Sequence, residues 1–190
     1  SFADGVAAGG PVFLADPAWG RGEREQFAAL VARSTADDDA RGWLGIPTGG
    51  SSGRLKLARH DEQTLAAAVR GFCGHFGSGR VNAVGLLPLH HVSGLMAWLR
   101  CLLTGGIYRP WDGRSLVAGK RPELGAGDWY LSLVPTQLAR MLNDAGAVDW
   151  MRGFRAVIVG GGPIWTDLAA AAAHLRLPLA FSYGMTETAA

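Results

Sequence analysis

The sequence predicts an α/β fold in which a mainly parallel sheet is flanked by helices. Segments with strand character alternate along the chain with segments of helical periodicity. Several strand segments, including 81–87 and 154–159, are apolar at consecutive positions, which is typical of strands buried on both faces of a parallel sheet. Glycine- and hydroxyl-rich stretches follow strand segments, and ligands bind at that carboxyl edge in open α/β sheets.

The pattern of apolar residues predicts three strands and two helices in the first part of the chain. Phe27, Leu30 and Val31 fall on one face of the first helix. Asp61, with Thr64 three residues later, indicates the capped start of the second. The polar, acidic stretch 34–41 lacks periodicity and predicts a solvated loop or a linker. The expected strands are 11–15, 43–46 and 55–59, and the expected helices are 23–33 and 61–76.

Strands and helices continue to alternate through the rest of the chain. Leu95, Leu99 and Leu102 recur at helical spacing, and Gly105 is expected to end that helix. Pro135 suits the first turn of the next helix. The expected strands are 81–87, 129–134, 154–159 and 179–182, and the expected helices lie between 91 and 105, at 135–145 and at 166–175.

Composition limits the classes of function. Hydrophobic residues make up 48% of the 190 residues and charged residues 18%, which excludes a disordered chain and allows a sizeable core. No apolar run approaches the roughly 20 residues of a membrane span, and no signal peptide is expected. The net charge of +2 comes from scattered basic residues, so no nucleic-acid surface is predicted. Two cysteines cannot form a disulfide framework, so a reducing, cytoplasmic location is expected.

The stretch 48–56 (TGGSSGRLK) is the most informative part of the sequence. Its glycines allow the backbone N–H groups to approach a ligand, and its hydroxyls add donors. Arg54 and Lys56 add positive charge. This combination suits a polyphosphate, although no Walker A register fits. A plain flexible loop is the alternative interpretation.

A rival interpretation concerns the same residues. The stretch 49–53 matches G-x-S-x-G, the nucleophile elbow of serine hydrolases, with Ser51 as the nucleophile. That motif requires a helix directly after the serine, whereas 55–59 has the pattern of a strand. The hydrolase interpretation is therefore disfavoured.

Three shorter motifs also follow predicted strands. His90 and His91 could serve a metal site only with further ligands, and a capping or core role is the alternative. The glycines of 160–163 (GGGP) do not form a dinucleotide fingerprint, because Trp165 occupies the position of its last glycine. The pair at 186–187 (Thr-Glu) could hold Mg²⁺ together with phosphate oxygens, or could be an ordinary surface pair.

Taken in order, four segments resemble the signature motifs of the adenylate-forming superfamily, which comprises acyl-CoA synthetases, adenylation domains and luciferases. The stretch 48–56 is similar to the family's phosphate loop, TSGTTGxPK, and 88–94 (PLHHVSG) to its P-L-x-H-x-x-G segment. The stretch 160–163 is similar to its GGAP adenine segment, and 182–188 (SYGMTET) to its YGxTE motif. The four segments occur in the family's order, and the resemblance covers about 43–190.

Within the superfamily, the stretches IPTGGSSG, VPTQLARML and SYGMTETA are most similar to the o-succinylbenzoate–CoA ligases of menaquinone and phylloquinone synthesis. Leu55 departs from the family's usual proline, and Gly49 from its serine. The resemblance implies that 43–190 is a partial AMP-binding domain, part of the large N-terminal domain of such an enzyme. Residues 1–42 are expected to form an N-terminal segment of strand, helix and linker, and the C-terminal domain is expected to be absent from these residues.

The resemblance implies an AMP-forming acid–thiol ligase that uses ATP, Mg²⁺ and, as co-substrate, coenzyme A. A carboxylate attacks the α-phosphate of ATP, and the thiol of coenzyme A then displaces AMP from the acyl-adenylate. Because the family's catalytic lysine lies on the C-terminal domain, these 190 residues alone are expected to turn over slowly or not at all. The alternatives are another acyl-CoA ligase, a serine hydrolase or a non-catalytic nucleotide-binding remnant.

The same resemblance implies a role for each matching residue. Lys56 would hold the β- and γ-phosphates, Thr186 would contact the α-phosphate and Glu187 would bind Mg²⁺. His91 would lie between the acyl pocket and the α-phosphate, and Tyr183 would stack on adenine. Nucleotide-binding roles are implied for Thr48, Gly49, Gly50, Ser51, Ser52, Gly53, Lys56, Gly160, Gly161, Gly162, Pro163, Ser182, Tyr183, Gly184, Met185 and Thr186.

Overall fold

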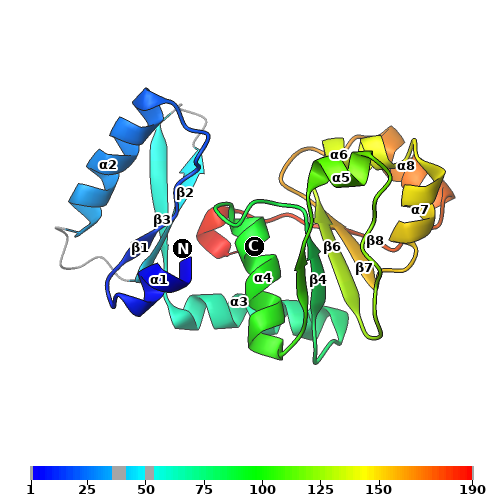
Figure 1. The fold of residues 1–190 in the computed structure, drawn as a ribbon, viewed down its shortest axis with the longest axis horizontal. Helices are drawn as coiled ribbons and strands as arrows, with labels where there is room; N and C mark the ends of the chain where they lie inside the picture. Colours follow the sequence, from blue (N-terminus) through cyan, green and yellow to red (C-terminus); the bar gives the residue numbers. More distant parts are fainter. Residues whose placement is uncertain (1, 36–41, 50–53, 190) are drawn as a thin grey trace.

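The computed structural model describes residues 2–35, 42–49 and 54–189 and contains two sheets (Figure 1). The smaller sheet has the order β1-β2-β3. Its strands are β1 (Val12–Phe13), β2 (Leu44–Gly49) and β3 (Leu55–His60), and the helices of this part are α1 (Phe2–Ala7) and α2 (Arg21–Thr35). Strand β1 pairs parallel to β2, and β2 pairs antiparallel to β3.

The larger sheet has five strands, all parallel, in the order β5-β4-β6-β7-β8. They are β4 (Asn82–Gly85), β5 (Tyr108–Pro110), β6 (Trp129–Leu133), β7 (Ala156–Val159) and β8 (Leu179–Phe181). The chain moves from β4 to one side and then returns to add three strands on the other. A switch point therefore lies between β4 and β6, and open α/β sheets bind ligands beyond the strands at such a point.

Helices cover both faces of the larger sheet. They are α3 (Glu62–Phe76), α4 (Val92–Thr104), α5 (Gly113–Val117), α6 (Pro135–Met141), α7 (Ala145–Met151) and α8 (Thr166–His174), and η1 (Thr186–Thr188) is a short 3-10 turn. Side chains alternate between the faces of a strand. Leu131 and Val157 accordingly pack with α5–α8, whereas Tyr130 and Ala156 pack with α3 and α4.

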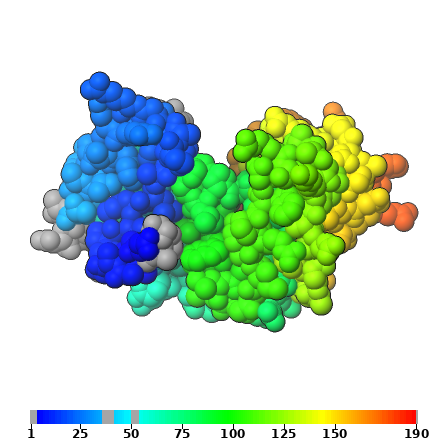
Figure 2. Space-filling view, viewed as in Figure 1, coloured from blue at the N-terminus to red at the C-terminus, as the bar shows by residue number. Residues whose placement is uncertain are grey.

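Helix α4 is apolar on two opposite sides. Leu95, Met96 and Leu99 pack with β2 and α3 under the smaller sheet. Ala97 and Cys101 pack against the larger sheet. At about 100° per residue these two sets point in roughly opposite directions, so one helix serves two cores. Figure 2 shows the result: the N-terminal elements (blue) form a mass beside the larger green-to-red part, and the two meet along the middle.

The structure confirms most of the expected elements. Asp61 caps α3 with a capping box to Thr64, and Gly105 ends α4 in the left-handed conformation, φ 67°. No helix among the described residues is long and apolar enough to cross a membrane. Strand β2 runs on to Gly49, so the start of the expected loop is extended instead. The predicted linker at 34–41 falls mostly outside the described residues, and its first two residues continue α2.

The prediction of one helix at 135–145 is wrong. Helix α6 ends before Leu142, and Asp144 starts α7 by accepting a hydrogen bond from the N–H of Ala147 at 3.2 Å. An N-cap carboxylate stabilises a new helix start, so the chain turns there rather than continuing. The short elements α1, β5 and α5 were not expected from the sequence, because they are too brief to show a period.

Replacing Leu131 by alanine is expected to destabilise the chain by about 2–5 kcal/mol. Leu131 is fully buried between β6 and the α5–α8 layer, so its removal leaves a cavity. Leu102→Ala is the matched control, because Leu102 is 57% exposed and its loss is expected to cost only about 0.5 kcal/mol. Urea unfolding measures both; equal losses would contradict the assigned core.

Candidate functional site

A cavity of about 520 Å³ lies at the carboxyl edge of the larger sheet. Its walls come from the ends of β6, β7 and β8 and the segments that follow β4, β6, β7 and β8, together with residues of α3 and α4, and Pro47 of β2 reaches it from the smaller sheet. This is the edge that contains the switch point between β4 and β6. Eight of the residues that the sequence predicted for a site line this cavity: His91, Gly160, Gly161, Ser182, Tyr183, Gly184, Met185 and Thr186.

Two strand ends hold the back wall of the cavity in place. The N–H of Gly160 donates to the carbonyl of Leu133 at 3.2 Å, and the N–H of Ser182 donates to that of Val159 at 2.9 Å. A Cβ on Gly160 would overlap the hydroxyl of Ser182, so this close approach requires glycine. In the GGGP stretch, the absence of a side chain at Gly160 lets the backbone form part of the cavity wall.

The β2–β3 hairpin carries the described part of the expected phosphate loop. Thr48 lies directly opposite Lys56 in the antiparallel register, so their side chains emerge on the same face. By alternation along the strands, that face also carries Ile46 and His60, which are buried. Both strands contact η1, which Figure 1 shows between the hairpin and α4. The hairpin thus brings Lys56 to the same side as the Thr186–Thr188 turn.

A buried hydrogen bond joins the hairpin to that turn. His60, only 2% exposed, has its Nε2 2.8 Å from the carbonyl oxygen of Thr186. A carbonyl oxygen only accepts, so Nε2 is the donor. His60 was not among the expected site residues, since a histidine inside a strand pattern gives no signal of a partner 126 residues away.

Lys56 and Glu187 are free to bind a ligand. Both side chains are exposed, and neither makes a hydrogen bond or an ion pair with another described residue. Neither residue lines the cavity, although Glu187 directly follows Thr186, which does. An unpaired ammonium and an unpaired carboxylate suit a phosphate group and a divalent cation, respectively.

The remaining expected residues fall into two groups. Gly162 and Pro163 are exposed and lie outside the cavity lining. Thr48 and Gly49, on the hairpin, also lie outside the cavity lining. The other group lies outside the described residues: Gly50, Ser51, Ser52 and Gly53. The elbow interpretation of Ser51 is nevertheless contradicted, because strand β3 follows at Leu55 where that motif needs a helix.

His91 stands where α4 begins. It occupies the N-cap position but makes no capping bond through its side chain, so the capping alternative for this histidine is wrong. Burial, and then the neighbouring His90, lower the pKa of His91 below its ordinary value, while Asp16 opposes the shift. A more neutral imidazole on the cavity wall can accept or pass on a proton.

Arg100 lines the cavity and was not expected there. Its guanidinium lies over the ring of Phe72, 4.2 Å from the centroid, and its buried Nε has no hydrogen-bond partner among the described residues. Burial lowers the pKa of Arg100 to about 10. The one feature of the sequence that could have indicated a role for Arg100 is its place as the one charged residue of a mostly apolar helix. A partly buried guanidinium on a cavity wall suits an anionic ligand group.

Comparison with known proteins assigns the family. The model of the family described as AMP-binding enzyme matches residues 35–190. A probable 2-succinylbenzoate–CoA ligase of Mycobacterium tuberculosis H37Rv is 32% identical over 169 residues, which are 85% of this chain and 43% of that protein. The 2-succinylbenzoate–CoA ligase of Salmonella typhimurium is 35% identical over 145 residues, or 75% and 30% of the two chains.

A solved structure agrees with the fold. The o-succinylbenzoate coenzyme A synthetase of Bacillus subtilis, in complex with ATP and a magnesium ion, superposes with a TM-score of 0.62 at 21% identity, covering 79% of this chain and 31% of that one. The chain therefore spans less than half the length of these relatives. It belongs to the AMP-binding enzyme family.

Replacing His60 by alanine is expected to destabilise the chain by about 1–3 kcal/mol, because a buried hydrogen bond is lost. The loss should also loosen η1, which measurement of hydrogen exchange at the amides of Thr188 and Ala189 would detect. His174→Ala is the control, since His174 is exposed at the end of α8. Unchanged exchange at those amides in the His60 variant would contradict the link between hairpin and turn.

Proposed function

We propose that this member of the AMP-binding enzyme family provides the nucleotide- and carboxylate-binding part of an ATP-dependent acid–thiol ligase. The enzyme would form an acyl-adenylate and then a coenzyme A thioester. The observation that supports this most is the gathering of three motif segments around one cavity, next to the hairpin that carries Lys56. We further propose that 43–190 is the partial adenylation domain and 1–42 a segment that precedes it.

The first half-reaction is an electrostatic problem. A carboxylate oxygen attacks the α-phosphorus of ATP, the bond to the bridging oxygen breaks, and pyrophosphate leaves with the electron pair. Two anions must therefore meet, so positioning and charge neutralisation provide most of the catalysis. Lys56 and Thr48 would bind the β- and γ-phosphates together with the glycine-rich loop, and Thr186 would contact the α-phosphate.

Glu187 would hold Mg²⁺ with phosphate oxygens as the other ligands. Its unpaired, exposed carboxylate fits a hard cation that keeps several oxygen ligands. When bound, the ion neutralises charge on the phosphates. The bond from His60 to the Thr186 carbonyl would fix this turn while the nucleotide binds.

Adenine would bind at the open end of the cavity. Tyr183 is 94% exposed, and a free aromatic ring beside backbone groups can stack on a planar base. The backbone at Gly160 and Gly161 lines the same cavity and could contact the edge of the base. This arrangement supports a nucleotide rather than a simple anion as the ligand.

The acyl substrate would be a dicarboxylate, with 2-succinylbenzoate as our specific proposal. One carboxylate reacts, and Arg100 offers a partly buried cation on the cavity wall for the other. His91, on the same wall, would lie between the acyl group and the α-phosphate. This substrate is the one that the names of the two relatives give for them. It would place the enzyme in menaquinone or phylloquinone synthesis in the cytoplasm, with coenzyme A as thiol acceptor.

Lys56→Ala is expected to weaken the binding of ATP·Mg by about 10- to 100-fold, which is what a charge-assisted hydrogen bond of roughly 1.5–3 kcal/mol provides. Calorimetry on the 190-residue chain measures it. Arg114→Ala is the matched control, because Arg114 is an exposed cation on α5, far in sequence from the motifs. If the two variants bound ATP·Mg with equal affinity, Lys56 would have no role in binding the phosphates.

Arg100→Gln is expected to lower the affinity for 2-succinylbenzoate by about 10- to 100-fold and to leave that for a matched monocarboxylate unchanged. The reason is that only the dicarboxylate uses the partly buried guanidinium. Binding of both acids in the presence of ATP·Mg measures the difference. An equal loss for the two acids would contradict the specificity role and favour another acyl-CoA ligase.

A further inference from the structure

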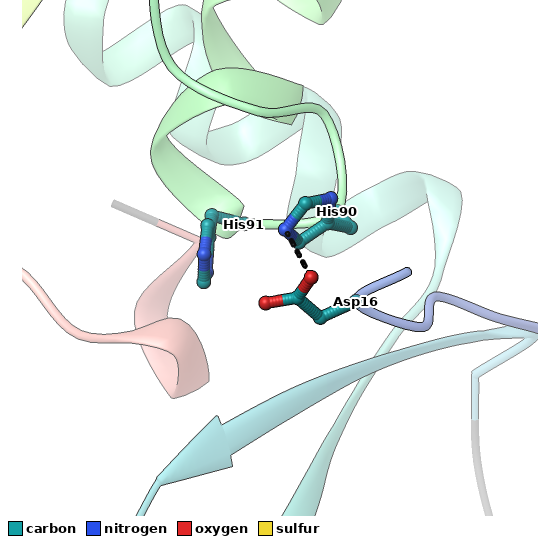
Figure 3. Close-up of side chains that lie close together, drawn as sticks. All are labelled: Asp16, His90 and His91. Atoms are coloured by element: carbon teal, nitrogen blue, oxygen red, sulfur yellow. Dashed lines mark ion pairs between the residues drawn. The ribbon is translucent and has the colours of Figure 1, made fainter. Parts of the chain in front are cut away.

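One group of side chains, which joins the N-terminal segment to the wall of the cavity, has the composition of a metal centre. Among the described residues, Asp16, His90 and His91 bring a carboxylate oxygen and two imidazole nitrogens within 4.8 Å of one another. Figure 3 shows the carboxylate entering from the N-terminal segment and the two rings lying beside it at the start of α4. Asp16 lies 74 positions before His90 in the sequence, so only the tertiary structure brings the carboxylate to the two histidines.

We propose that Asp16, His90 and His91 form a binding site for Zn²⁺. Two histidines and one carboxylate are a ligand set that zinc sites use when a fourth position is left for water or another ligand. A tetrahedral ion with bonds of about 2.0–2.1 Å places its ligand atoms about 3.3 Å apart. The distance from His90 Nε2 to Asp16 Oδ1 is 3.5 Å, close to that spacing.

The third ligand needs only a small side-chain adjustment. The rings of His90 and His91 have centroids 4.5 Å apart and are tilted by 49°, so they are not locked in a stack. His91 makes no capping bond that it would have to give up.

The carboxylate of Asp16 is held by a hydrogen bond within its own turn. Its Oδ1 accepts a hydrogen bond from the N–H of Ala18 at 2.8 Å, which orients the carboxylate toward His90. The side chains of His90 and Asp16 are 20% and 24% exposed, so an ion can reach them while competing water is reduced.

Binding at this site would tie the N-terminal segment to the start of α4. It would also occupy His91, which lines the cavity. Zinc and the acyl-side ligand would then compete for one imidazole. That consequence rests on the proposed function, whereas ion binding itself does not.

The test is titration of the untagged 190-residue chain with Zn²⁺, and with Co²⁺ as a spectroscopic probe, without nucleotide and with excess Mg²⁺ to occupy oxygen-only sites. Wild type is expected to bind one ion and to give the visible absorption of tetrahedral Co²⁺. Asp16→Asn and His90→Gln should each lower Zn²⁺ affinity at least about tenfold, since even outer-shell partners cost 10- to 100-fold. The matched controls Asp149→Asn and His174→Gln, both at exposed residues, should not.

The site would be overturned by any of the following results: no Zn²⁺ binding by wild type, an absorption spectrum of octahedral Co²⁺, or an affinity that neither variant lowers more than its control. Loss in His90→Gln alone would also overturn it, because the carboxylate would then not be a ligand. The Co²⁺ spectrum of wild type needs no variant, so it decides the matter even if a variant misfolds. None of these results depends on ATP binding, so the proposed function stands or falls separately.

Discussion

The packing of α3 and α4 between two sheets is the constraint on which the rest of the structure depends. Helix α4 packs into two cores at once: Leu95 and Leu99 lie in one, and Ala97 and Cys101 on the opposite side lie in the other. Apolar burial on two sides fixes the helix more firmly than the single stripe of a surface helix. Because the smaller sheet rests on this pair, the hairpin cannot move away from the larger sheet without exposing a core.

This arrangement separates the scaffold from the groups that would do chemistry. The central strands β4, β6 and β7 of the larger sheet are mostly buried, whereas Lys56 on β3 and Tyr183 and Glu187 after β8 are exposed. Under the proposed function, the rigid strands would hold these groups near one ligand at little cost in ordering them. The bond from His60 to Thr186 extends the scaffold across the gap between the two sheets.

The cavity lining combines groups of different chemistry. Arg100 contributes a cation that lies over Phe72 and whose Nε has no hydrogen-bond partner among the described residues. The segments after β7 and β8 contribute backbone and the exposed ring of Tyr183. His91 lines the same cavity and also lies close to Asp16 and His90, so it connects the cavity to the N-terminal segment.

Local patterns in the sequence determined the local structure. The capping box at Asp61, the glycine at 105 and the apolar strands were predictable because each depends on neighbours within a few residues. The four motifs predicted which segments would form a site, and residues of three of them line one cavity.

Only the tertiary structure decided which distant residues meet. Arg100, His60 and Asp16 gain their roles from partners on other elements, brought near by the packing of two sheets around α3 and α4. A sequence pattern reports what a residue prefers nearby, whereas these contacts follow from how buried apolar faces fit together across the whole chain.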